Sequence, residues 1–562
     1  MLTKLFETLI QCIINFLSHA AGQAETGHIS PNRRFFSKGL LGRLLGRQQG
    51  LPNSAVVPAP SADAPVVIGE IIPSAREALR QRNVPPVPIS LTTQMRSKHL
   101  YCVGKSGMGK TNFNVQLIDA DIAAGDGDSG SDARAVVLLD YRGDLADRVC
   151  KRLAARYDPE ELADRLLLID LRTPPAAAGI PQEAFTVPFN PLTQCGPNPY
   201  TRAFFVLDVF EQHLGAALGV QISETLRNCL LALAMTGRTL LDIELILSSD
   251  EARAEILSQV ADTGVLRFFA RYAALNEAQK MLWANPIQNK ISPWIAHPVL
   301  KNMLGSSISV SIQDFLDQRP NAIILFCAGA DEHFGSTAAL MTNLFVNSVA
   351  AAAMRTNRPR RGGVLLYVDE FQNLSSDKFA EIISEGRRFG LWTTLSHQSP
   401  SQLEPKIRTL VRNVVGTSLF FGVGGVDAES LAGEIASDEP KTVLRNLLIN
   451  QGVGEAMLVR QGMAAARIKT RHAPDPEVSD AAVHALRQAC LRRHGRPASE
   501  VEQELRMREA LFPHPAVGQK PKDQTARKTT AGAAAVRSPK RSKGHLGFPP
   551  DSEQYEVRDH DE

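Results

Sequence analysis

The sequence predicts an α/β fold with a mostly parallel sheet, an inserted all-helical region and disordered ends. Short apolar segments alternate with segments of helical periodicity over most of the chain. The apolar segments lack the polar alternation of a half-exposed strand, which indicates strands covered on both faces and hence a parallel sheet. The predicted strands are residues 100–103, 135–140, 166–170, 322–328, 364–369, 391–396, 418–423 and 456–459.

Length and composition fit a soluble protein with more than one domain. At 562 residues the chain exceeds what one hydrophobic core usually holds. Its 44% hydrophobic and 22% charged residues are typical of soluble globular proteins, and a net charge of +3 is too small to indicate nucleic-acid binding by itself. Seven cysteines without C-x-x-C spacing favour reduced thiols in the cytoplasm over disulfides or zinc sites.

The alternation of strands and helices is interrupted between residues 200 and 313. The pattern there is helical, with helices predicted at 223–234, 251–272 and 277–284. We expect this stretch to be an all-α insertion that divides the α/β core into two parts. The full division is 1–21 for an N-terminal helix, 22–65 for a flexible basic linker, 66–199 and 314–475 for the two parts of the core, 200–313 for the insertion, 476–512 for C-terminal helices and 513–562 for a disordered tail.

Residues 2–17 carry apolar side chains at helical spacing, interrupted by polar ones such as Lys4, Glu7 and Gln11. No run approaches the roughly 20 apolar residues that a membrane span needs. An amphipathic helix is predicted, and three positions stay open for it: on a membrane surface, on a partner protein, or packed within the chain. No cleavable signal peptide is predicted, because the uninterrupted apolar region is missing. We expect a cytoplasmic protein, either free or at the periphery of the inner membrane.

The most informative motif is a glycine-rich loop between a predicted strand and a predicted helix. It matches the pattern G-x-x-x-x-G-K-[ST] and comprises Gly104, Lys105, Ser106, Gly107, Met108, Gly109, Lys110 and Thr111. In such a unit, backbone N–H groups and the positive end of the helix at 112–119 point at one phosphate group. Lys110 would reach the β- and γ-phosphates of ATP, and the Thr111 hydroxyl would ligate Mg²⁺. An ordinary glycine-rich turn does not explain a Lys-Thr pair at a helix start.

A second motif is the apolar strand at 364–368, which ends in two acids. A buried strand next to the glycine-rich loop would carry these acids to the bound phosphates. Asp369 would hold the Mg²⁺ shell, and Glu370 would orient and polarise the attacking water. The alternative is a buried strand followed by two helix-capping acids. The glycine-rich loop upstream favours the catalytic interpretation.

Polar residues also follow two other predicted strands. Gln398 is the candidate for a sensor that hydrogen-bonds the γ-phosphate or the lytic water. His397 beside it is interpreted as a structural histidine and receives no role. After the strand at 135–140, we expect Asp144 to cap the next helix, and Asp140 stays a candidate for an outer-shell contact of the metal.

Arg387 and Arg388 lie between the Asp369-Glu370 pair and Gln398, near a predicted helix end. Two adjacent arginines usually form a solvated face or pair with nearby acids, here Glu381 and Glu385. An oligomeric ATPase, however, needs a cation that stabilises charge on the γ-phosphate bound by the neighbouring subunit. Arg387 is the better candidate for this trans-acting residue, and Arg388 is the second choice.

Together these segments resemble the HerA/FtsK-type DNA-pumping ATPases, and most of all the conjugative coupling proteins of type IV secretion (the TraD/TraG group). The resemblance covers roughly residues 89–471, is most specific at 367–374 and 385–391, and is weaker at 411–417. It implies a RecA-like P-loop core with an inserted helical domain. It also implies a hexamer that uses ATP to move DNA through a central channel, with a relaxase and secretion-channel proteins as partners.

The chain departs from this family in two ways. Many relatives have Pro-His-Gly after the second core strand, where this chain has Tyr141-Arg142-Gly143, so no role is carried over to that loop. Coupling proteins at a secretion pore usually begin with two membrane-spanning helices, and none is predicted here. We therefore expect attachment through residues 2–17 or through a partner.

Two other functions stay open on sequence alone. The same ATPase could move proteins or remodel a complex, or the chain could be a nucleotide-gated scaffold with little turnover. Glu370 argues against the scaffold, because a binding site alone needs no water-activating carboxylate. The basic tail either holds DNA loosely or keeps the segment soluble. Its basic residues include Lys520, Lys522, Arg527, Lys528, Arg537, Lys540, Arg541 and Lys543.

Overall fold

The computed structural model describes ten segments of the chain. They are residues 65–73, 86–126, 133–172, 184–194, 196–214, 219–330, 335–355, 363–374, 377–437 and 439–511. All of them belong to one compact unit, Ala59–Glu562. The predicted helix at 2–17, nearly all of the predicted linker and the predicted tail at 513–562 lie outside the described residues.

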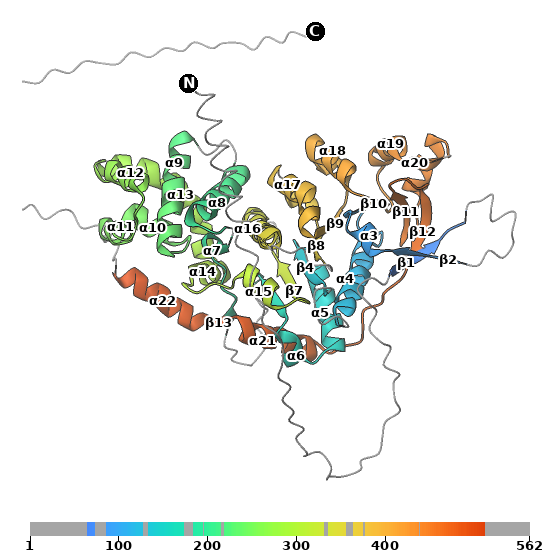
Figure 1. Ribbon diagram of the computed structural model, residues 1–562, viewed down its shortest axis with the longest axis horizontal. Helices are drawn as coiled ribbons and strands as arrows, with labels where there is room; N and C mark the ends of the chain where they lie inside the picture. The colour runs from blue at the N-terminus through green and yellow to red at the C-terminus, as the bar shows by residue number, and fades with distance from the viewer. Residues whose placement is uncertain are drawn as a thin grey trace, which may run out of the picture. The chain divides into compact units, whose positions relative to one another are not determined.

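The core of this unit is an 11-stranded sheet in the order β2-β1-β12-β11-β10-β3-β9-β8-β4-β7-β5 (Figure 1). The strands from β10 to β5 are parallel to their neighbours. They are β3 (Leu100–Val103), β4 (Ala135–Asp140), β5 (Leu166–Asp170), β7 (Ile323–Cys327), β8 (Val364–Val368), β9 (Leu391–His397) and β10 (Thr417–Phe420). Each matches a strand predicted from its apolar run, which confirms the α/β class and the mostly parallel sheet.

The other end of the sheet pairs antiparallel, an arrangement that the sequence did not predict, although its strand β11 matches the strand predicted at 456–459. Its strands are β1 (Val66–Ile71), β2 (Val87–Leu91), β11 (Glu455–Arg460) and β12 (Ala466–Thr470). They pair antiparallel in the order β2-β1-β12-β11, and β11 also pairs antiparallel with β10. Buried and exposed residues mix along β1, β2 and β12, so no apolar run marks them. The short strands β6 (Phe185–Thr186) and β13 (Arg496–Pro497) form a separate ribbon.

Helices cover both faces of the parallel strands. They include α3 (Thr93–Arg96), α4 (Lys110–Asp126), α5 (Asp144–Arg156), α6 (Pro159–Ala163), α16 (Gly335–Arg355), α17 (Asp377–Gly386), α18 (Pro405–Val414), α19 (Gly425–Glu434) and α20 (Lys441–Ile449). Successive strand residues point to opposite faces. In β4, Val137 and Leu139 join the apolar cluster that contains α16, whereas Val136 and Leu138 join the cluster that contains α4 and α5. Both faces of the sheet are therefore covered by apolar side chains of the helices, as the apolar strands predicted.

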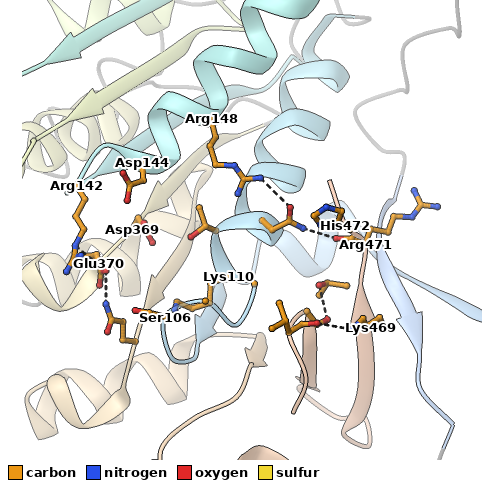
Figure 2. Close-up of a pocket in the computed structure, with 18 residues that line it drawn as sticks. Ser106, Lys110, Arg142, Asp144, Arg148, Asp369, Glu370, Lys469, Arg471 and His472 are labelled. Atoms are coloured by element: carbon orange, nitrogen blue, oxygen red, sulfur yellow. Dashed lines mark hydrogen bonds and ion pairs between the residues drawn. The ribbon is translucent and has the colours of Figure 1, made fainter. Parts of the chain in front are cut away.

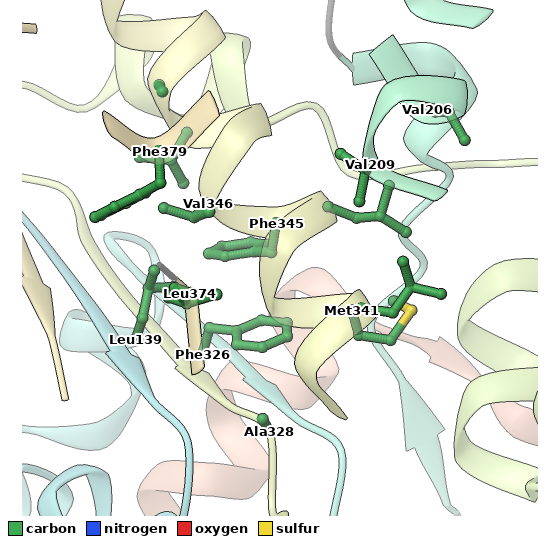
Figure 3. Packing of buried hydrophobic residues seen from close by; sticks show 14 of the residues in the cluster. Leu139, Val206, Val209, Phe326, Ala328, Met341, Phe345, Val346, Leu374 and Phe379 are labelled. Carbon is green, nitrogen blue, oxygen red and sulfur yellow. The ribbon is translucent and has the colours of Figure 1, made fainter. Parts of the chain in front are cut away.

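Helix α16 packs along one face of the sheet. Its Phe345 stacks on Phe326 of β7, with ring centroids 4.4 Å apart and ring planes 16° from parallel (Figure 3). In the part of the chain that the structure describes, residues 337–355 are the one helical stretch long and apolar enough to cross a membrane, with a mean hydropathy of 1.3. Because 72% of that stretch is buried within the protein, packing against the sheet accounts for its apolar composition.

Helices fill the stretch predicted as an all-α insertion. They are α8 (Pro199–Leu214), α9 (Val220–Thr236), α10 (Asp242–Ser248), α11 (Asp250–Leu257), α12 (Thr263–Ala273), α13 (Glu277–Ala296) and α14 (Pro298–Gly305). Helix α7 (Pro191–Gln194) precedes this stretch, and α15 (Ile312–Gln318) begins at its end. The single helix predicted at 251–272 is wrong, because this stretch forms α11 and α12. The Asp262 carboxylate caps α12 by accepting from the N–H groups of Gly264 and Val265, each at 2.8 Å. The division at residues 200 and 313 stays a prediction.

A buried ionic cluster joins α3 and α4 to β8. The Arg96 guanidinium donates to both carboxylate oxygens of Asp121, at 2.8 and 2.7 Å, and to the Tyr367 hydroxyl at 2.7 Å. Arg134 donates to Asp121 at 3.1 Å, and the Tyr367 hydroxyl donates to the same carboxylate. None of the four side chains is more than 3% exposed. The cluster fixes β8 two residues before Asp369.

The C-terminal strap, Asp480–Leu511, links the sheet to the helical region. It consists of α21 (Asp480–His494), β13 and α22 (Ala498–Leu511). Figure 1 shows it in orange-red running past α6 and α15 to α14. In α21, Arg487 donates to Asp147 of α5 at 2.5 Å and to Asp170 at 2.8 Å. In α22, Arg508 pairs with Asp242 of α10 at 3.2 Å. Ion pairs therefore hold the strap at both ends.

Candidate active site

A cleft of about 500 Å³ lies where β3, β4, β8 and β9 reach their carboxyl ends. Ligands of open α/β sheets bind at this edge. The cleft is lined by Ser106, Gly107, Gly109, Lys110, Thr111, Asn112, Arg142, Asp144, Arg148, Asp369, Glu370, Gln398, Val453, Gly454, Lys469, Thr470, Arg471 and His472 (Figure 2). The structure thus brings together the predicted Lys110, Thr111, Asp369, Glu370 and Gln398, which come from three separate segments.

The glycine-rich loop connects β3 to α4 as predicted. Gly107 and Gly109 have φ angles of +77° and +107°, which glycine adopts without strain. At Gly109 a Cβ would also lie 3.1 Å from the backbone of Gly454, so a side chain there would be crowded as well as strained. The Lys110 ammonium folds back and donates to the carbonyl oxygens of Gly104 and Lys105, at 2.5 and 3.1 Å. Burial lowers the pKa of Lys110, an effect opposed by the nearby carboxylates.

Asp369 directly follows β8 and lines the cleft. Its Oδ1 accepts from the Ser396 hydroxyl at 2.7 Å, and Ser396 accepts from the Asn114 amide at 2.9 Å. Burial raises the pKa of Asp369 to about 6, and the charge of Asp140 adds to the effect. A cation beside this carboxylate would lower that pKa again. The buried carboxylate therefore suits a bound cation.

The donor set around Asp369 is that of a hard cation. Asp369 and Thr111 both line the cleft and offer a carboxylate and a hydroxyl, and both are oxygen ligands of the kind that Mg²⁺ prefers. Among the described residues, no group of three His, Cys, Asp or Glu side chains is placed to hold a metal ion. A cation held by these two side chains would complete its shell with phosphate and water oxygens, as Mg²⁺ commonly does.

Glu370 is held from three sides. Its Oε1 accepts from Nε2 of Gln398 at 3.0 Å, and its Oε2 accepts from Nε2 of Gln372 at 2.8 Å. Nε of Arg142 lies 3.7 Å from Oε1. The backbone of Glu370 has a φ of +52°, a left-handed conformation that is uncommon outside glycine. Such strain persists where the surroundings impose it, often at functional sites.

The loop after β4 differs from the prediction. The Asp140 carboxylate accepts from the N–H groups of Arg142, Gly143 and Ala146, at 3.1, 2.8 and 2.8 Å. Asp140 is therefore the acid that caps α5, the role assigned to Asp144 from the sequence. Asp144 is exposed and lines the cleft instead. Sequence position could not separate them, because either acid can reach the same helix N-terminus.

Arg387 lies outside the cleft of its own chain. It begins the short helix η3 (Arg387–Phe389), directly before the amino end of β9, whereas Gln398 follows the carboxyl end of that strand. Both Arg387 and Arg388 are exposed. Arg388 pairs with Glu385 at 3.4 Å, which is the solvated-face arrangement weighed from the sequence. The trans-acting role of Arg387 stays a prediction.

His397 is structural, as interpreted. It is fully buried, and its Nε2 lies 2.7 Å from the Tyr101 hydroxyl. Burial lowers the pKa of His397 to about 3, and the charge of Lys110 acts in the same direction. The ring is therefore neutral at physiological pH.

One wall of the cleft is not marked by any motif in the sequence. It comes from the loop before β11, a strand that the sequence predicts, and from the end of β12, a strand that it does not. Lys469 donates to the carbonyl of Val453 at 2.8 Å, and Thr470 donates to that of Gly454 at 2.9 Å. Asn112 of α4 donates to the carbonyl of Arg471 at 3.0 Å. No motif marks this wall, because backbone groups make most of these contacts.

Comparison with known protein families and with curated proteins finds no match. Solved structures do match. A bacterial conjugative coupling protein, TrwBdeltaN70, is 14% identical with a TM-score of 0.48, over 75% of this chain and 96% of that chain. The coupling protein TrwB in complex with ADP and Mg²⁺ is 15% identical with a TM-score of 0.48, over 75% and 97% of the two chains. VirB4 of Thermoanaerobacter pseudethanolicus is 13% identical with a TM-score of 0.48, over 73% and 96%.

Proposed function

We propose that this protein is an ATP-hydrolysing motor of the conjugative coupling type, which moves DNA through the channel of a hexamer. One observation carries the ATPase part: Lys110, Asp369, Glu370 and Gln398 converge in one cleft at the ends of adjacent strands. A P-loop lysine, a metal-binding acid, a water-orienting acid and a polar sensor are the parts that phosphoryl transfer to water uses.

The cleft residues divide the work of hydrolysis among them. The phosphates of ATP replace the carbonyl oxygens that Lys110 now contacts, and the loop N–H groups complete the cradle. Thr111 and Asp369 would hold Mg²⁺, which neutralises phosphate charge when bound. Glu370 orients the attacking water, and Gln398 fixes the Glu370 carboxylate. The neutral His397 stays behind the site as packing.

The DNA part of the proposal comes from the motifs at 367–374 and 385–391, which resemble DNA-pumping ATPases, and from the position of Arg387. An exposed arginine at the opposite end of β9 cannot serve its own cleft, but it is free to enter the cleft of a neighbour. A ring of subunits supplies such a neighbour. A relaxase and secretion-channel proteins are the proposed partners, and the cytoplasm is the proposed location.

The test is the ATPase rate against protein concentration, with single-stranded DNA, with double-stranded DNA and without DNA. The proposal predicts a rate that rises cooperatively with concentration and is stimulated by DNA. An ATPase rate that is the same with single-stranded DNA, with double-stranded DNA and without DNA would favour a protein substrate instead. Glu370→Gln should abolish turnover while nucleotide still binds, and a normal rate in this variant would refute the catalytic assignment.

A further inference from the structure

Arg142 in the loop after β4 has no role in the mechanism above, yet it lies in the cleft beside Glu370 (Figure 2). Its Nε is 3.7 Å from Oε1 of Glu370, the oxygen that also accepts from Gln398. The loop is the one at which this sequence departs from the pattern of the family it resembles. Arg142 therefore adds a positive charge to the cleft that no sequence motif predicts.

The backbone of Arg142 is anchored while its side chain is not. The Asp140 carboxylate is 1% exposed and accepts from the N–H groups of Arg142 and of Gly143, so the start of the side chain is fixed. The guanidinium end lies in the open cleft, and the side chain is 63% exposed. The backbone anchor thus sets how far the side chain reaches, while its guanidinium is exposed to the cleft and pairs with Glu370 alone among the contacts described above.

The ion pair between Arg142 and Glu370 is weak enough to be exchanged. A pair at 3.7 Å with one largely exposed partner contributes little, because water screens it. A terminal phosphate group carries more charge than one carboxylate and accepts two hydrogen bonds from a guanidinium. Since Glu370 orients the water that attacks the γ-phosphate, a group in contact with Glu370 is also within reach of that phosphate.

We propose that Arg142 is a positioning residue that detects the γ-phosphate from within its own subunit, an inference that rests on the proposed ATP site. Without nucleotide, its guanidinium pairs with Glu370. When ATP binds, the guanidinium donates to γ-phosphate oxygens and leaves Oε1 of Glu370 to the water. When the γ-phosphate departs, the pair with Glu370 forms again. ADP therefore binds without the help of Arg142.

The experiment compares nucleotide affinities by calorimetry in the presence of Mg²⁺. Wild type, Arg142→Ala and Arg142→Lys are titrated with ADP and with an ATP analogue that cannot be hydrolysed. For Arg142→Ala we expect the Kd of the analogue to rise roughly 10- to 100-fold, the loss of a charge-assisted contact, with the Kd of ADP changed less than about twofold. Arg142→Lys should recover part of the affinity, because lysine keeps the positive charge but lacks the paired N–H donors of the planar guanidinium group. Arg267→Ala is the control, since Arg267 is exposed on α12 and donates to its own helix.

The outcomes separate the two proposals. If wild type binds both nucleotides and Arg142→Ala weakens both equally or neither, the sensing role is wrong and the ATP site stands. If wild type binds neither nucleotide, the proposed function fails and takes this inference with it. Selective loss of the triphosphate, with partial recovery by lysine, supports the role, because a merely structural effect of the loop would act on both nucleotides.

Discussion

Gln398 donates from Nε2 to Oε1 of Glu370 across 3.0 Å, so the polar residue after β9 holds the acid after β8. Gln372 holds the second oxygen of the same carboxylate at 2.8 Å. The Glu370 backbone is itself fixed at a φ of +52°. The carboxylate is therefore oriented before any nucleotide arrives, and this preorganisation is what a water-positioning group needs.

We expect Gln398→Ala to lower kcat for ATP hydrolysis by roughly 10- to 100-fold, because Glu370 loses the donor that fixes its Oε1. Nucleotide affinity should change by less than about threefold, since the loop and Lys110 that bind the phosphates are untouched. Steady-state kinetics and calorimetry measure the two quantities. Gln259→Ala, at an exposed glutamine in the helical region, is the control. An unchanged kcat in Gln398→Ala would contradict the role.

The pKa of Asp369 predicts a pH dependence of stability. Burial raises it to about 6 from an ordinary 3.8, so the native state binds this proton more tightly than the unfolded chain does. The contribution of Asp369 to the free energy of unfolding is therefore fully present below about pH 4 and is lost as the pH rises through about 6. Over that interval, we expect wild type without Mg²⁺ to lose up to about 3 kcal/mol of unfolding free energy relative to Asp369→Asn. Urea denaturation from pH 4 to 7.5 measures the difference.

Mg²⁺ should reverse this trend. Only the ionised Asp369 ligates the cation, so we expect Mg²⁺-nucleotide binding to strengthen as the pH rises through about 6 and to be weak in Asp369→Asn at every pH. Calorimetric titrations across the same pH range provide the measurement. Parallel pH profiles for the two proteins would show that another group controls the dependence.

Arg387 can be tested by mixing subunits. Arg387→Ala alone should lose at least about 100-fold in kcat while its nucleotide affinity is kept, because the missing cation belongs to the neighbouring cleft. Lys110→Ala alone should be inactive for lack of binding. A mixture of the two should regain activity, since interfaces arise with an intact cleft on one side and an intact Arg387 on the other. Arg388→Ala, at an arginine paired with Glu385, is the matched control. No recovery in the mixture would place Arg387 outside catalysis.

The buried ionic cluster predicts a large stability effect. Asp121→Ala leaves Arg96 and Arg134 buried without their shared carboxylate, which should cost about 3–5 kcal/mol. Tyr367→Phe removes one hydroxyl from the same cluster and should cost about 1–2 kcal/mol. Urea denaturation of each variant provides the values. Asp126→Ala, at the more exposed end of α4, is the matched control and should have the smaller effect. Equal losses for Asp121 and Asp126 would contradict the prediction.

Much of the sheet could be predicted, because β3 and β8 are apolar along their whole length and β4 is apolar up to Asp140, and burial on both faces demands that composition. The glycine-rich loop and the Asp369-Glu370 pair could be located for a similar reason, since their chemistry fixes residue type and spacing. The edge strand β2 could not, because exposed residues such as Val87 leave it without an apolar run.

The contacts within the site were less accessible from the sequence. The capping role of Asp140 or Asp144 depends on which carboxylate faces the first turn of α5, and both stand at suitable positions. The wall formed by Lys469 and Thr470 is defined by contacts to backbone carbonyls of residues 453 and 454, which no side-chain pattern records. The pairing of Arg142 with Glu370 joins two residues far apart in the chain.

The strap gives the helical region a second connection to the catalytic edge of the sheet, independent of the chain crossings near residues 199 and 312. Arg487 of the strap donates to Asp147, which lies one helical turn after Asp144 at the rim of the cleft. At the other end of the strap, Arg508 forms an ion pair with Asp242. The strap therefore couples α5, at the rim of the cleft, mechanically to α10 in the helical region.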